Sequence, residues 1–189
     1  MKLMLLGLLV FLGAHVFTTM RVARAGVIAK IGEGPYKGLY SVVSIVGLFM
    51  IGYGFAAWRV EGPPQLWYPP VWAKHLAILL MLFASISLLA GYMPSHIRIW
   101  LKHPMLVAVK IWALAHLLTN GDLAGIVLFG AVLIWAVWSR ISQKTRPEPR
   151  YPKPKWTADG IAVLIGFGVF AFLGYLFHPY VIGVPVMPA

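Results

Sequence analysis

The sequence contains no cysteine among its 189 residues. This absence excludes disulfide bonds, iron–sulfur clusters, thiolate ligation of a metal and catalysis by a cysteine nucleophile. Any metal ion must therefore be bound by histidine, by methionine or by one of the few carboxylates. The chain has six histidines and eight methionines from which such ligands would be drawn.

Acidic residues are also scarce. Only five Asp and Glu residues oppose 16 Lys and Arg residues, which gives a formal net charge of +11. In a soluble protein this excess would indicate nucleic-acid binding, but basic and aromatic residues are not interleaved as a nucleic-acid surface requires. The basic residues instead fall between apolar runs, where contact with anionic lipid explains them. We therefore expect membrane lipid, and not nucleic acid, as a partner.

Apolar residues dominate the remainder of the chain. Hydrophobic residues make up 60% of it and charged residues 11%, and the mean hydropathy is +0.82, which is typical of a polytopic membrane protein. A bilayer core of ~30 Å takes about 20 helical residues. We predict an all-α fold, a transmembrane helical bundle of about six helices in one integral membrane domain, residues 1–189. The predicted helices cover residues 3–20, 39–58, 71–92, 104–119, 122–138 and 161–177, and a basic, proline-rich cytoplasmic linker covers residues 140–156.

Turn signals separate several of these runs. Residues 32–35, Gly-Glu-Gly-Pro, predict a turn, and the prolines of residues 61–70 exclude a helix there. Asn120 and Gly121 end the fourth run, and Asp122 is placed to cap the fifth. The fourth and fifth helices are therefore predicted to form a tight hairpin.

The distribution of Lys and Arg predicts the orientation. The loops after the first, third and fifth predicted helices hold four, two and six of these residues, whereas the opposite side has only Lys2, Arg59 and Lys74. Because cytoplasmic loops are enriched in positive charge, both termini are expected in the periplasm. Arg21 and Arg24 follow the first apolar run, whereas a cleaved secretory signal has its charge in front. We therefore expect a retained helix.

Two histidines, His15 and His116, lie well inside apolar runs. An ionisable side chain within a membrane segment marks a candidate site, because its burial is costly without a partner or a cavity. Trp112, Ala113 and His116 share one helical face, and the small Ala113 leaves room beside the imidazole. His15 shares a face with two threonines, which favours a position facing the bundle.

Two interpretations of this pair stay open. One imidazole from each of two helices suits a six-coordinate haem b, whose iron takes a neutral nitrogen on each side in an apolar slot. Alternatively, each histidine makes an interhelical hydrogen bond worth about 0.6 kcal/mol. At 1.5 Å per residue, His15 lies about 9 Å from Arg21 and His116 about 18 Å from Pro104. Shared ligation of one iron therefore requires the fourth helix to tilt or to begin below the interface.

The other four histidines are interpreted as interfacial or structural. His75 lies near the outer surface at the start of the third run, and His96 and His103 lie in a basic loop where they would face water or phosphate headgroups. His178 precedes Pro179 at the exit of the last predicted helix, which favours a structural role.

Several segments resemble the NnrU family of bacterial membrane proteins. These are KHPML (102–106), WALAHLL (112–118), NGDLA (120–124) and LFG (128–130), together with GAH (13–15) and GYMP (91–94). The resemblance implies an association with denitrification, through nitrite and nitric oxide reduction. The family is similar to zeta-carotene isomerase, an integral membrane protein that binds haem b through two histidines. By position, those ligands correspond to His15 and His116. The cysteine proposed as an alternative ligand of the isomerase corresponds to Ala113 here, so exchange to a thiolate is not available.

The sequence thus favours a haem b protein of the bacterial inner membrane that senses or handles nitric oxide or electrons, with a reductase or electron-transfer partner. One alternative is a membrane enzyme, either polyene isomerase-like or methyltransferase-like. The second is suggested by His103-Pro104, although no second His-Pro pair followed by glutamate occurs in a basic cytoplasmic segment. Another alternative is a cofactor-free assembly factor for a reductase. No catalytic residue is assigned.

Overall fold

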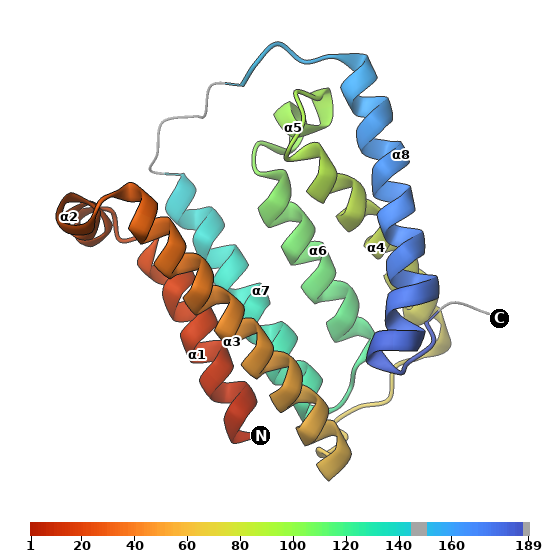
Figure 1. Cartoon of the computed structure of the whole chain (residues 1–189). Coiled ribbons are helices and arrows are strands. Elements are labelled where there is room, and N and C mark those ends of the chain that lie inside the picture. Colours follow the sequence, from red (N-terminus) through yellow and green to blue (C-terminus); the bar gives the residue numbers. More distant parts are fainter. Residues whose placement is uncertain (145–150, 187–189) are drawn as a thin grey trace. The chain divides into compact units, whose positions relative to one another are not determined.

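The computed structural model describes residues 1–144 and 151–186 (Figure 1). In these residues the regular structure is entirely helical, with eight α-helices and one π-helix, which confirms the predicted all-α fold. The chain forms two compact units. Unit 1 comprises Met1–Tyr68 and Asn120–Thr145, and unit 2 comprises Pro69–Thr119 and Arg146–Ala189.

Unit 1 is organised around a close contact between α1 (Lys2–Phe17) and α3 (Glu33–Glu61). Glycines permit this approach, because an ideal Cβ on Gly54 would lie 2.2 Å from the backbone nitrogen of Met4, and one on Gly47 would lie 2.9 Å from that of Phe11. The third long helix, α7 (Leu123–Gln143), contacts both α1 and α3 (Figure 1).

Residues 21–31 form the helix α2 (Arg21–Ile31), although the sequence predicted a loop. The hydroxyls of Thr18 and Thr19 donate to the carbonyls of His15 and Val16, both at 2.7 Å, where α1 ends. The axis of α2 is bent by 89° from that of α1. The prediction was wrong because basic residues mark contact with water or headgroups but are compatible with a helix. The turn predicted at residues 32–35 is reduced to Gly32, which has a φ of +86° between α2 and α3.

The loop of residues 62–70 packs against the segment before α7. The backbone N–H of Leu66 donates to the carbonyl of Gly121 at 2.8 Å, and that of Leu123 donates to the carbonyl of Pro64 at 2.9 Å. A Cβ on Gly121 would lie 1.8 Å from the carbonyl oxygen of Trp67, so only glycine fits there. Asp122 caps α7 as predicted, because its Oδ1 accepts the Gly125 N–H at 2.9 Å.

Unit 2 is built around α4 (Val71–Ala90), which packs against both α6 (Pro104–Thr119) and α8 (Trp156–Phe172). Small residues again line these contacts. The buried residues of α4 are alanines and serines, and an ideal Cβ on Gly166 of α8 would lie 2.7 Å from the Cα of Ile86. Helices α4 and α6 begin at the predicted residues.

Two features of unit 2 differ from the prediction. The loop between α4 and α6 contains a short helix, α5 (His96–Leu101), whose N-cap Ser95 accepts the Arg98 N–H at 3.1 Å. The last helix begins at Trp156, five positions before the predicted start at residue 161, and continues through Pro179 as a π-helix, η1 (Leu173–Ile182). Helix α7 also reaches Gln143, so the start of the predicted linker is helical, and residues 145–150 of that linker lie outside the described residues.

The helix lengths and the exposed surface fit a multi-pass membrane protein. By length and composition, four of the described helices are able to cross a membrane, α3, α4, α7 and the combined α8–η1, and the bent pair α1–α2 would make a fifth. With 16 residues, α6 is a shorter apolar helix, so the count of six spans stays a prediction. Large apolar side chains are exposed on these helices, including Phe49 at 63%, Ile134 at 72% and Leu164 at 73%, as expected where lipid takes the place of water. Only three residues connect α6 to α7, but the two helices belong to different units, so their packing as a hairpin also stays a prediction.

Candidate functional site

The first predicted ligand, His15, lies on α1 near its C-terminal end and is half-buried. Its ring centroid lies 4.2 Å from that of Phe11, 5.3 Å from that of Tyr40 on α3 and 5.2 Å from that of Trp135 on α7. The imidazole is therefore surrounded by aromatic rings from all three long helices of unit 1. The prediction that this face of α1 points into the bundle is confirmed.

A backbone hydrogen bond fixes the protonation of this imidazole. Nδ1 of His15 lies 2.7 Å from the carbonyl oxygen of Phe11, four residues earlier. Because a carbonyl oxygen only accepts, Nδ1 must carry the hydrogen, and in neutral imidazole the lone pair then resides on Nε2. Histidines that bind metals are typically held in this way, with the other ring N–H donated to a carbonyl or a carboxylate.

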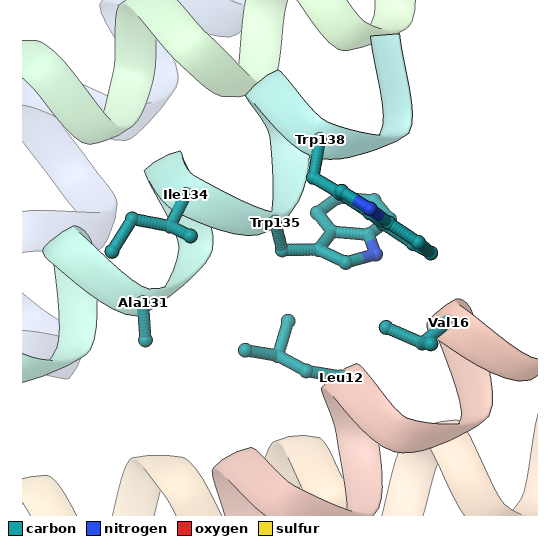
Figure 2. Close-up of a pocket in the computed structure, with 6 residues that line it drawn as sticks. All are labelled: Leu12, Val16, Ala131, Ile134, Trp135 and Trp138. Carbon is teal, nitrogen blue, oxygen red and sulfur yellow. The ribbon is translucent and has the colours of Figure 1, made fainter. Parts of the chain in front are cut away.

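Two apolar hollows flank His15. The first has a volume of about 390 Å³ and is formed by Leu12 and Val16 of α1 and by four residues of α7, which face each other in Figure 2: Ala131, Ile134, Trp135 and Trp138. The second, of about 250 Å³, is lined mainly by residues of α1 and α3, including Ala14, Tyr36 and Tyr40. Trp135 lines the first hollow and Tyr40 lines the second, and the rings of both contact the His15 ring.

Unpaired polar atoms accompany these hollows. Among the residues that the structure describes, Trp135 Nε1 and Tyr36 Oη are buried without a hydrogen-bond partner. An unpaired buried polar atom costs free energy and calls for an explanation. Trp135 and Tyr36 each line one hollow. Two buried hydrogen-bond donors therefore belong to side chains that line the hollows.

The second predicted ligand, His116, lies on α6 in unit 2 and is also half-buried. Its Nδ1 lies 2.8 Å from the carbonyl oxygen of Trp112, again four residues earlier, so its lone pair also resides on Nε2. The Trp112 and His116 ring centroids are 5.0 Å apart. Ala113, beside which the sequence predicted room, is fully buried, whereas Trp112 and His116 on the same face are half-buried.

A third histidine, which sequence reasoning did not include among the ligands, lies close to His116. The ring of His178 in η1 has its centroid 6.2 Å from that of His116, and the two rings are inclined by 27°. Its Nδ1 bonds the carbonyl of Leu173 at 2.8 Å. Pro179 predicts the end of the helix, so only a structural role was expected for His178. The chain instead continues through Pro179 as a π-helix. The sequence did contain a signal for this residue, because His178 is a polar ring between Phe177 and Pro179 in an otherwise apolar segment.

The structure thus brings His116 and His178 together in unit 2, while His15 belongs to unit 1. The pairing of His15 with His116 across one iron stays a prediction. No group of three or more His, Cys, Asp or Glu side chains suited to a metal ion occurs among the described residues. A haem needs only one or two protein ligands to its iron.

The remaining polar cluster of unit 2 has a structural explanation. His96, interpreted from the sequence as facing water or headgroups, instead bonds Asp159 Oδ2 through its Nδ1 at 2.6 Å and stacks on Trp156 with ring centroids 4.0 Å apart. Asp159 Oδ1 accepts the backbone N–H of Ile97 at 3.0 Å. This pair connects α5 to the start of α8. His75 is exposed on α4, as its interfacial interpretation predicts.

Comparison with known proteins identifies the chain at the family level. No curated protein and no solved structure matches it. The family described as NnrU protein matches residues 3–186, which includes the last helix as well as the segments that carried the resemblance. The chain therefore belongs to the NnrU family.

Proposed function

We propose that this protein binds one haem b in the bacterial inner membrane, with His15 and His116 as its axial ligands. The observation that carries the proposal is the state of the two imidazoles. Each donates its Nδ1–H to the backbone carbonyl four residues earlier, at 2.7 and 2.8 Å, and so has its lone pair on Nε2. Both side chains are half-buried on apolar helices. A backbone carbonyl accepts the Nδ1–H of each imidazole, so no carboxylate is needed to orient either ring.

The surroundings of His15 support a flat, largely apolar ligand with a polar edge. The two hollows beside the imidazole are almost wholly apolar and are bordered by aromatic rings. The buried donors on Trp135 and Tyr36 suit an acceptor such as a haem propionate. A bound haem would supply one-electron redox chemistry and a binding site for nitric oxide.

Membership of the NnrU family connects the haem proposal to denitrification. We propose that the protein senses nitric oxide or transfers electrons in nitrite and nitric oxide metabolism, with a reductase or electron carrier as partner. We propose that both termini lie in the periplasm, because 12 of the Lys and Arg residues fall in the segments after the first, third and fifth apolar runs. An enzyme of the isomerase type is less favoured, because Ala113 replaces the cysteine ligand and is buried.

The proposal is tested by visible spectroscopy of the protein purified in detergent, oxidised and reduced, with the haem content measured separately. Wild type should contain one haem per chain with the bands of a six-coordinate, low-spin haem. His15→Ala and His116→Ala should each lose the six-coordinate bands, because each substitution removes one axial ligand. The matched control is His75→Ala, which removes an exposed imidazole of α4 and should match wild type in spectrum and potential.

Each alternative gives a different result in the same experiment. A stable but colourless wild-type protein would overturn the haem proposal and favour a cofactor-free assembly factor. Bound S-adenosylmethionine would favour the methyltransferase. Haem bands with unchanged potential in both His15→Ala and His116→Ala would show that the haem binds elsewhere.

A further inference from the structure

We propose that helix α2 lies in the plane of the membrane surface and binds the headgroups of anionic phospholipids through Arg21 and Lys30. Nothing in this role requires haem, so it is independent of the proposed function. The direction of the helix is the first observation, because α2 is bent by 89° from α1. Figure 1 shows α2 at the end of α1, seen nearly along its own axis. When α1 crosses the membrane, a helix at a right angle to it runs parallel to the membrane surface.

The charge of α2 excludes the hydrocarbon core as its location. The helix carries Arg21, Arg24 and Lys30 and no acidic residue. Although α1 and α2 together have the length of one broken span, three cations among lipid tails are costly. The helix therefore belongs at the interface, where long basic side chains reach the headgroups while apolar atoms lie below them.

One face of α2 is already occupied by contacts inside unit 1. The helix packs against α3, and Arg24, Val27 and Ile28 on this face are half-buried. The guanidinium carbon of Arg24 lies 5.5 Å from the centroid of the Tyr36 ring. This face therefore positions the helix, and its cation already has an aromatic partner.

The opposite face is exposed and has the pattern of a helix that lies in a membrane surface. Val22, Ala25 and Ala29 share it through spacings of three and four residues, and Val22 is 88% exposed. Arg21 and Lys30 lie on the two sides of this apolar strip, because nine positions make two and a half helical turns. The strip suits the region just beneath the headgroups, and the two cations reach from its edges to the phosphates.

Charge complementarity identifies the ligand. Arg21 and Lys30 are exposed and form no ion pair with any other residue that the structure describes. Glu33, the nearest acidic residue in the sequence, pairs with Lys37 at 2.9 Å. The protein therefore leaves the charge of α2 available to the phosphates of anionic lipid, which lie at the level of an interfacial helix.

The test uses one fluorescent reporter, which the absence of cysteine permits. Ala25→Cys, in the full-length protein in lipid nanodiscs, is labelled with an uncharged fluorophore on the exposed strip. Its quenching is compared for phosphatidylglycerol and phosphatidylcholine that carry the same acyl-chain spin label near the headgroup. Phosphatidylglycerol should be preferred about fivefold or more, because one basic residue near the surface contributes roughly that factor. The preference should fall at 1 M salt, where the Debye length is only about 3 Å.

Two charge variants are compared on the Ala25→Cys background. Arg21→Gln/Lys30→Gln should bring the ratio of the two lipid affinities close to one. The matched control is Arg59→Gln/Lys74→Gln, which also removes two cations but from outside α2, and it should retain the preference. Circular dichroism of each variant checks that the helices are retained.

Three results would overturn the role of α2. Equal quenching by both lipids together with strong quenching by aqueous acrylamide would place α2 in water, where its cations would suit a soluble acidic partner. Protection from acrylamide without any lipid preference would place the helix in the hydrocarbon core. An unchanged preference in Arg21→Gln/Lys30→Gln would refute the role of these two cations. Haem content enters none of these measurements, so failure of the haem proposal is recognised separately.

Discussion

Substitution of Gly54 by alanine should destabilise unit 1 more than the same substitution at any other glycine of α3. An ideal Cβ at this position would lie 2.2 Å from the backbone nitrogen of Met4, 2.7 Å from its Cα and 2.9 Å from the carbonyl carbon of Leu3. These are backbone atoms of α1, so no side-chain rotation relieves the clash. Met4 is itself fully buried, and separation of the helices would expose it.

The magnitude follows from the distance that must be regained. Non-bonded carbon atoms make favourable contact at about 3.5 Å, so α1 must move from α3 by about 1 Å near Gly54. Overpacking of a close contact costs about 1 to 3 kcal/mol, and a backbone clash of this size belongs at the upper limit of that range. Gly47→Ala should cost about 1 kcal/mol, because its Cβ would lie 2.9 Å from the nitrogen of Phe11 and needs a smaller shift.

Gly52→Ala is the matched control. It makes the same substitution on the same helix at an exposed position, where a Cβ would meet no atom within 4 Å. Alanine favours the helix over glycine by up to about 1 kcal/mol, so Gly52→Ala should be neutral or stabilising. The assay is reversible unfolding in mixed micelles of mild detergent and dodecyl sulfate, followed by circular dichroism. Equal stability of Gly54→Ala and Gly52→Ala would refute the close packing of α1 on α3.

Three other predictions concern the capping, pairing and orientation of the helices. Asp122→Ala should lower the free energy of unfolding by about 1 kcal/mol through loss of the α7 cap, whereas Asp122→Asn should retain most of it; equal melting temperatures for the two variants would contradict this. Asp159→Ala should lower the melting temperature more than Asp159→Asn, because only alanine leaves both His96 Nδ1 and a backbone N–H without a partner, and the reverse order would count against the pair. Since the chain has no cysteine, Lys153→Cys and Tyr68→Cys each introduce one reactive thiol. An impermeant thiol reagent added to intact cells should label Tyr68→Cys and spare Lys153→Cys, and the opposite pattern would reverse the proposed orientation.

The sequence predicted the helices of this protein well where their signal is local. Each apolar run became a helix, because a segment in lipid must satisfy its backbone hydrogen bonds internally. Helices α4 and α6 begin at the predicted residues, since prolines at residues 70 and 104 mark their starts. The helices α2 and α5 were missed because their basic residues resemble those of exposed loops, and hydropathy does not separate a helix at the interface from a loop.

Part of the candidate site could also be predicted. His15 and His116 stand out because a polar ring within an apolar run is rare, and the NnrU resemblance points to the same two residues. Their backbone hydrogen bonds are a local consequence of helical spacing, since the acceptor lies four residues earlier in both cases. The proximity of His178 to His116 was missed because it depends on which helices pack together. Pro179 also wrongly indicated the end of the helix.

The amino-acid sequence by itself determined that this chain is helical and suited to a membrane, where its charges gather, and that imidazole is its main nitrogen donor for a metal. Those properties depend on composition and on neighbours within a few residues. Only the tertiary structure decided that Gly54 meets the backbone of Met4, that His96 pairs with Asp159 across 63 positions, and that His178 faces His116. These contacts arise from the packing of whole helices against one another. The periodicity of apolar residues within one helix does not specify which faces of different helices will meet.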